Sequence, residues 1–218
     1  MNYKRSGGTS PNMNNYESVL RPLIVQTLQY FADWMELNND KHEALNKGLE
    51  IVILPDYKTN DGDTIYYETR KVNWDDFRGR PSASGRYGAA IFSNFGYQSS
   101  FKISKGIIQA FVETRTYMVR GMSWANETAK TENSLAHEQL HFDITKLVVE
   151  RFKKKVRAMK AESIEDLNSM IQYEYLESYK EMNRLQKDYD NETRHSLDTF
   201  QQAEWAQKIK IWLTEVVG

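Results

Sequence analysis

The chain has 218 residues, of which 40% are hydrophobic, and its 29 basic and 30 acidic residues leave a net charge of −1. Because the positive and negative charges nearly cancel, there is no electrostatic reason to expect a nucleic acid or an anionic membrane as a partner. Cysteine is absent, which excludes disulfides and thiolate zinc sites, so any metal must be held by imidazole and carboxylate groups.

The N-terminal part is predicted to be a polar tail followed by a helical segment. Residues 1–14 are rich in Asn, Ser and Gly, lack the pattern of an export signal, and are expected to be flexible. Over residues 16–35 apolar residues recur at helical spacing, with Pro22 near the expected first turn. A shorter helix is expected over residues 41–47. Residues 15–50 are therefore assigned to an N-terminal helical segment.

The middle of the chain is predicted to be rich in strands. Short segments with β-branched and aromatic residues, bounded by turn-forming residues, occur at 51–54, 65–67, 89–95, 101–103 and 107–119. No run of about 18 apolar residues is present, so no membrane span is expected.

The pattern becomes helical after Trp124. Apolar residues with a period near 3.6 predict one long helix over residues 140–156 and a second over residues 167–185, which follows a capping-box sequence at Ser163. A third helix is expected from about residue 199 to 213. The predicted fold is therefore α+β, with residues 51–218 forming one domain.

Residues 137–141 read His-Glu-Gln-Leu-His, an HExxH pentad within the first of these helices. Positions four apart on a helix are offset by only about 40° around the axis and about 6 Å along it, so His137 and His141 can bind one metal ion. Glu138 is expected to act as general base toward a metal-activated water. The pentad thus predicts a Zn²⁺ site of a hydrolase.

A catalytic zinc usually has three protein ligands, so a third has to come from elsewhere. The metzincin extension requires Gly and His at positions occupied by Ile144 and Leu147, which excludes that scheme. A carboxylate from the next helix is one alternative, and the candidates are Glu174, Glu177 and Glu181. His195, at the turn before the last predicted helix, is preferred.

The wider sequence resembles a bacterial domain family of unknown function, described as predicted secreted zinc-dependent proteases. Residues 137–144 are similar to its HEQxHFDI motif. Other similar segments follow the family's order: W-x-D-F-x-G at 74–79, S-W at 123–124, YDxxTxH at 189–195 and Q-x-x-W at 202–205. The resemblance spans roughly residues 65–212. Ser196 departs from it, since glycine is expected after the histidine.

The resemblance implies a zincin-like fold in which His137, His141 and His195 bind zinc and Glu138 is the catalytic base. It also implies an extracytoplasmic location, periplasmic or secreted, whereas the absence of a signal sequence leaves a cytoplasmic location open. Asp190 is expected either to orient a ligand imidazole or to cap the last helix, with capping preferred.

The function predicted from these features is a zinc-dependent peptidase that acts on a peptide or protein substrate. Tyr189 or Arg194 is the expected oxyanion donor, and the strand at 107–119 is expected to offer its edge to an extended peptide. The alternative is a non-catalytic binding or scaffold domain of the cell envelope, stabilised by zinc. Glu138 favours catalysis, because a structural zinc site is closed by four ligands and has no use for a base. The sequence does not indicate the oligomeric state.

Overall fold

The computed structural model describes residues 13–37, 48–58, 62–81 and 87–217, and the chain divides into two units, Met1–Lys47 and Gly48–Gly218. In the first unit, helix α1 (Met13–Leu37) confirms the predicted N-terminal helix. It begins earlier than the apolar periodicity indicated, so Pro22 lies inside the helix. The expected helix at 41–47, and most of the expected tail, lie outside the described residues. None of the described helices is long and apolar enough to cross a membrane.

The second unit is built on a mixed sheet around strand β5 (Ile107–Val119). Strand β4 (Ser93–Ser104) pairs with one side of β5 along its whole length. On the other side lie β1 (Gly48–Ile53), which is parallel to β5, and β2 (Thr64–Tyr66), which is antiparallel. The strands predicted at 51–54, 65–67, 101–103 and 107–119 are confirmed.

The segment predicted as one strand at 89–95 contains parts of two strands. Strand β3 (Ala89–Ala90) pairs with β6 (Trp124–Ala125), and the chain then joins β4 at Ser93. The change of partner, from β6 to β5, interrupts the strand. This short second sheet lies beside the candidate site described below.

The turn between β4 and β5 has only two residues, since Ser104 pairs with Ile107. Both of them, Lys105 and Gly106, have positive φ angles of 53° and 81°. Positive φ at both central positions is the conformation that matches the twist of a hairpin. The two longest strands are therefore joined by a local, well-defined turn.

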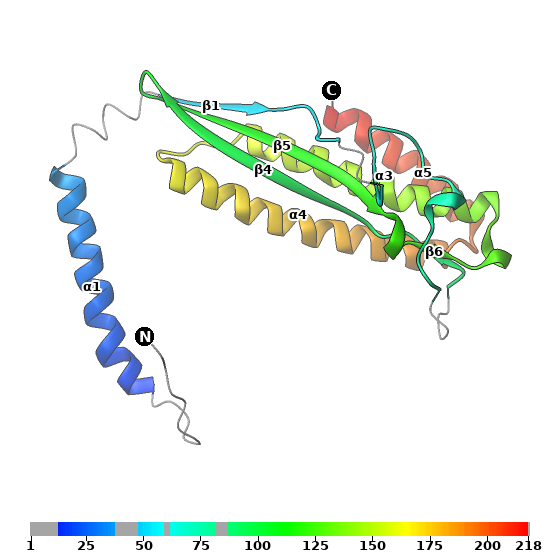
Figure 1. The fold of residues 1–218 in the computed structure, drawn as a ribbon, viewed down its shortest axis with the longest axis horizontal. Helices are drawn as coiled ribbons and strands as arrows, with labels where there is room; N and C mark the ends of the chain where they lie inside the picture. The colour runs from blue at the N-terminus through cyan, green and yellow to red at the C-terminus, as the bar shows by residue number, and fades with distance from the viewer. Residues whose placement is uncertain (1–12, 38–47, 59–61, 82–86, 218) are drawn as a thin grey trace. The chain divides into compact units, whose positions relative to one another are not determined.

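Helix α3 (Glu132–Arg157) is the central element of the second unit, and helices α4 (Ile164–Thr193) and α5 (Thr199–Val217) pack against it. Figure 1 shows the sheet on one face of these helices. The three predicted C-terminal helices are confirmed. Each has a side-chain N-cap: Thr131 accepts the N–H of Ser134, Ser163 that of Asp166, and Asp198 that of Gln201.

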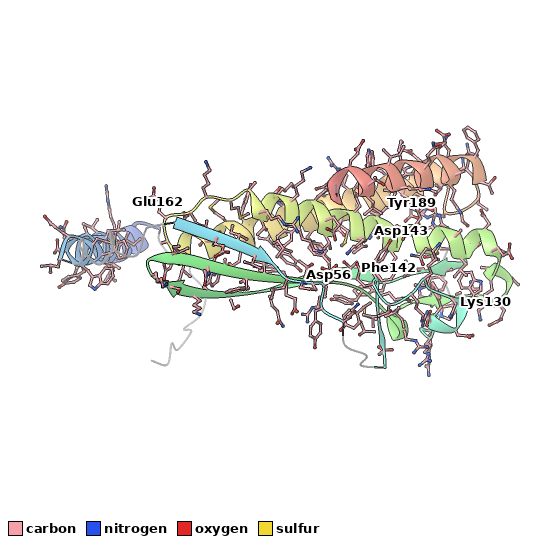
Figure 2. All side chains as sticks on the ribbon, turned by 90° about the horizontal axis from the view of Figure 1, so that it is seen from above. Asp56, Lys130, Phe142, Asp143, Glu162 and Tyr189 are labelled. Carbon is pink, nitrogen blue, oxygen red and sulfur yellow. The ribbon has the colours of Figure 1, made fainter. Side chains whose placement is uncertain are left out.

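Helix α3 is buried on opposite sides by different clusters. Phe142 packs with Ile65 and Met118 on the sheet side, whereas Ile144 and Tyr189 belong to the cluster shared with α4 and α5. In Figure 2, Phe142 lies toward the strands and Tyr189 among the helices. The orientation of α3 is therefore fixed from both sides.

The W-x-D-F-x-G segment has a structural role. Trp74 and Phe77 pack in the cluster around Phe142, as expected for core anchors. The fully buried Asp76 accepts two hydrogen bonds from Arg70, of 2.6 and 2.7 Å. A Cβ atom on Gly79 would lie 2.9 Å from the carbonyl oxygens of two other residues, so this position requires glycine.

A group of buried ions joins α3 to the segment after β1. Asp56 accepts hydrogen bonds from Lys146 and Lys153, both at 2.5 Å, and from Thr114 at 2.6 Å. Burial opposes ionisation of this carboxyl, but the hydrogen bonds from the two lysines and Thr114 outweigh it and lower the pKa of Asp56 to about 2. Glu150 is the second shared partner of the lysines, 2.8 Å from each.

Replacing Asp56 by Asn should destabilise the second unit. We expect Asp56→Asn to lower the free energy of unfolding at neutral pH by about 2 kcal/mol or more, since two buried lysines lose a partner and keep Glu150. Because the folded-state pKa lies below the unfolded value of about 3.9, this contribution is present above pH 4 and disappears as the pH falls toward 2. Urea unfolding across this range measures it. Asp188→Asn, on an exposed position of α4, is the control, and equal midpoints for the two variants would contradict the prediction.

Candidate metal centre

The two histidines of the pentad lie on one face of α3, and both rings are turned toward α4. Their side chains are almost completely buried, and the ring centroids are 4.9 Å apart. The Nε2 atoms of His137 and His141 lie 3.1 and 3.0 Å from the same atom, Oδ1 of Asp190. The helical spacing of the pentad thus produces the convergence that it predicted.

Asp190 completes a group of three ligand atoms that could hold a metal ion, all within 4.8 Å of one another. In a tetrahedral zinc site with bonds of about 2.0–2.1 Å, neighbouring ligand atoms are about 3.3 Å apart. The distances from Asp190 to the two imidazoles are close to this value. Two imidazole nitrogens and a carboxylate oxygen are also donors that zinc accepts.

Asp190 lies in the last turn of α4 and does not cap α5, so the preferred capping role is wrong. The N–H of Gln201 is accepted by the side chain of Asp198 instead. One signal in the sequence could have identified Asp190: it follows Gln186 by one helical turn, beside the buried stripe of Met182 and Tyr189. A polar pair in that position indicates a polar contact inside the domain.

His195 is brought to the site, although it is not part of the group of three. Its Nδ1 lies 3.3 Å from Oδ1 of Asp190, and its ring packs on Tyr87 with a centroid distance of 4.1 Å. The side chain is 37% exposed. Its position beside the carboxylate fits an orienting role, or ligation after a small movement of the ring.

The three glutamates considered as alternatives have other partners and do not line the cavity of the site. Glu174 pairs with Lys155, Glu177 with Lys180 and Glu181 with Arg151. Lys155 and Arg151 lie well beyond the pentad along α3. The structure does not bring these carboxylates to the two histidines.

Three consecutive residues after α4 have left-handed backbone conformations. The φ angles of Arg194, His195 and Ser196 are 49°, 54° and 71°. This conformation turns the chain back, so that the N–H of His195 bonds to the carbonyl of Asp190 at 2.9 Å. Asn133 of α3 holds the turn by donating to the carbonyl of Ser196 at 2.8 Å. The positive φ also explains why glycine is suited to position 196.

Tyr189 lies behind the metal group and not in the cavity. Its ring is fully buried, stacks on His137 at 4.6 Å, and packs against Trp205 at 5.5 Å. Its hydroxyl donates to the backbone carbonyl of His137 at 3.4 Å. This position differs from that of a donor to a substrate oxyanion and suits a residue that positions His137.

Glu138 faces the cavity beside the two histidines. Its Oε2 accepts the N–H of Ile91, just after β3, at 2.8 Å. Burial raises the pKa of Glu138, while the nearby His141 and His137 and this hydrogen bond act in the opposite direction. A buried carboxylate with an elevated pKa, next to a group that could hold a metal ion, has the character of a general base.

The residue between the ligands, Gln139, fixes the helix from its other side. It accepts the N–H of Val72 at 2.9 Å and donates to Asp143 at 2.8 Å. Asp143 also accepts a hydrogen bond from the hydroxyl of Tyr67 at 3.1 Å. The rotation of α3 about its axis is thus set by polar contacts to the segment after β2.

The hydrogen bonds within this group favour the charged forms of Asp190 and His141. Burial opposes ionisation of Asp190, but hydrogen bonds from His137 and His141 hold its pKa well below the usual range. Burial likewise opposes protonation of His141, yet the bond to Asp190 raises its pKa. A metal ion bound here would therefore displace a proton from His141.

A cavity of about 630 Å³ opens onto these residues. Small residues around β3 form part of its lining, and the turn after α4 forms another part, which includes Arg194 and His195. The expected oxyanion candidate Arg194 therefore lies at the cavity, unlike Tyr189. A space of this size accommodates several residues of an extended chain.

Residues 121–196 match a family described as a bacterial protein of unknown function (DUF922). The matching span includes the S-W pair, the pentad and the YDxxTxH segment, and the remaining similar segments lie outside it. Neither the comparison with curated proteins nor that with solved structures gave a match.

Replacing Asp190 should weaken zinc binding more than replacing His195. We expect Asp190→Ala to weaken zinc binding by more than about 100-fold, whereas His195→Ala should cost about 10-fold, as for a residue that orients a ligand. Competition with a chromophoric chelator measures both, with Asp188→Ala as the control on the same helix. The opposite ranking would make His195 the third ligand.

Ser196→Gly should stabilise the turn after α4. Relief of the left-handed backbone strain is expected to raise the free energy of unfolding by up to about 1 kcal/mol, reduced by the greater entropy of glycine in the unfolded chain. Thermal unfolding beside Ser169→Gly, a helical position that should lose stability, provides the comparison. A destabilised Ser196→Gly would show that the turn is not strained.

Proposed function

We propose that this protein is a zinc-dependent peptidase with a zincin-like architecture. The observation that carries the proposal is the convergence of His137, His141 and Asp190 at the floor of a cavity, with Glu138 beside them. The resemblance of residues 137–144 to the HEQxHFDI motif of predicted zinc-dependent proteases supports it, and the family model that matches these residues is itself described as of unknown function. The extracytoplasmic location implied by the resemblance is part of the proposal.

In this mechanism Glu138 carries the proton. His137, His141 and Asp190 would hold a zinc ion, which would supply Lewis acidity toward a carbonyl oxygen and lower the pKa of a water molecule to about 7. Glu138 takes the proton of the attacking water and passes it to the departing amine. The burial of Glu138 assists both steps, because it raises the pKa of the carboxyl toward the neutral pH at which the proton is taken up and released.

The substrate is proposed to bind along β3 and not along β5. The expected edge role of β5 is wrong, since β5 is paired on both sides. Just before β3, the carbonyl of Gly88 accepts the N–H of Asn126, just after β6. Alternation then directs the N–H and C=O of Ala89 away from β6. Ile91, two residues on, directs its N–H to Glu138, so this side of β3 faces the site.

His195 is the group proposed to stabilise the developing oxyanion. It lines the cavity, and the contacts of its Nδ1 with Asp190 and of its ring with Tyr87 fix its orientation. The second ring nitrogen can donate to a substrate oxygen when both ring nitrogens carry a proton. Tyr189 acts indirectly by positioning His137.

The alternative is a zinc-stabilised scaffold domain of the cell envelope. One observation favours it: His195 lies close enough to Asp190 that a ring movement would give four protein ligands, which is the closed arrangement of a structural site. The open cavity beside Glu138 favours catalysis instead.

Glu138→Gln tests the proposed function. The variant should retain its zinc content, since Glu138 is not a ligand, and lose hydrolysis of a fluorogenic peptide library by a factor of about 100 or more. Glu132→Gln, an exposed position on the same helix, should keep full activity. Activity that survives in Glu138→Gln would remove this residue from the mechanism, and a wild-type protein that binds zinc without hydrolysis would favour the scaffold.

A further inference from the structure

We propose that the cavity recognises a carboxylate group through Arg194, so that the substrates are peptides with a carboxylate near the scissile bond. This inference rests on the proposed peptidase function. The carboxylate is either the C-terminus of the peptide or the side chain of Asp or Glu, and guanidinium binds both in the same bidentate geometry.

The backbone of Arg194 is fixed at the wall of the cavity. It is the left-handed cap of α4, with its N–H directed to the carbonyls of Asn191 and Asp190. The turn is held further by the bond from the N–H of Asp198 to the carbonyl of Thr193, at 2.8 Å. A side chain that starts from such a constrained position loses little backbone freedom on binding.

The acidic residues nearest to Arg194 in the sequence have other partners. Asp190 contacts the histidines, Glu192 accepts the indole N–H of Trp205 at 2.7 Å, and Asp198 accepts the N–H of Gln201 at 3.0 Å. Within the described parts of the chain, Arg194 has no ion pair, and its side chain is exposed. By contrast, Arg70 and Arg151 are each paired with a carboxylate.

The charge of the cavity leaves this arginine unbalanced. The described acidic residues that line it are Glu138 and Asp190, and both have other partners, since Glu138 accepts the N–H of Ile91 and Asp190 contacts the two histidines of the pentad. Around β3 the cavity is lined by the small residues Gly88, Ala89 and Ala90, flanked by Tyr87 and Ile91, and the packing behind Gly88 is close, since a Cβ on it would lie 2.5 Å from that of Ala129. The small residues at β3 and the unpaired guanidinium of Arg194 suit an extended peptide that carries one negative charge.

Peptide binding, measured by calorimetry, tests the proposal without relying on turnover. The probes are acetyl-tetra-alanine with a free carboxyl end, the same peptide as an amide, and the amide with glutamate in the third position. They are titrated into the full chain carrying Glu138→Gln, with zinc and without it. Zinc content is measured separately, so failure of the metal site is recognised independently of carboxylate preference.

We expect one or both carboxylate peptides to bind about 10-fold or more tightly than the neutral amide, as for a charged hydrogen-bonded pair. The peptide that shows the preference identifies the source of the carboxylate. Adding Arg194→Gln should abolish the difference, Arg194→Lys should restore part of it, and Arg184→Gln, an exposed arginine on α4, should leave it unchanged. Equal binding of all three peptides, no binding of any, or a preference that survives Arg194→Gln would overturn the proposal.

Discussion

The packing of α4 on α3 at the candidate site depends on one contact, in which Oδ1 of Asp190 lies between the imidazoles of His137 and His141. It joins α3 to the last turn of α4, and the groups that support it are themselves ordered in layers. Tyr189 packs beneath His137, Trp205 packs beneath Tyr189, and Glu192 holds the indole of Trp205. A buried polar group of this kind is stable only when its partners are held in position, since an unpaired member would be costly. The apolar residues between the helices therefore hold His137 in position next to Asp190.

The sheet side of α3 contributes a different constraint. Gln139 and Asp143 fix the rotation of the helix, while Lys146 and Lys153 attach its later turns to Asp56. Successive turns of α3 are thus held by the amide of Gln139, the carboxylate of Asp143 and the ammonium groups of the two lysines. This division leaves one short face, which carries the pentad, directed toward the cavity.

The sequence predicted the elements whose periodicity is strong, and it predicted less where tertiary contacts decide. The pentad and the C-terminal helices follow from spacing alone, because a helix places residues four apart on one face. Asp190 was assigned another role because its contact with His137 depends on how two helices pack. The pairing of β5 on both sides was equally hidden, since β1 joins it from a distant part of the chain. The left-handed turn at 194–196 has no glycine to signal it.

The hairpin turn at Lys105 and Gly106 bears on the order of assembly. Strands β4 and β5 can pair early, because the chain between them is minimal, whereas β1 must wait for residue 48 to meet residue 107, a separation of 59. The last helices likewise connect near neighbours in the chain. Local pairing is therefore expected first at these two places, and the candidate ligands from α3 and α4 come together only when those helices dock, so a metal ion could be held by them only after that step.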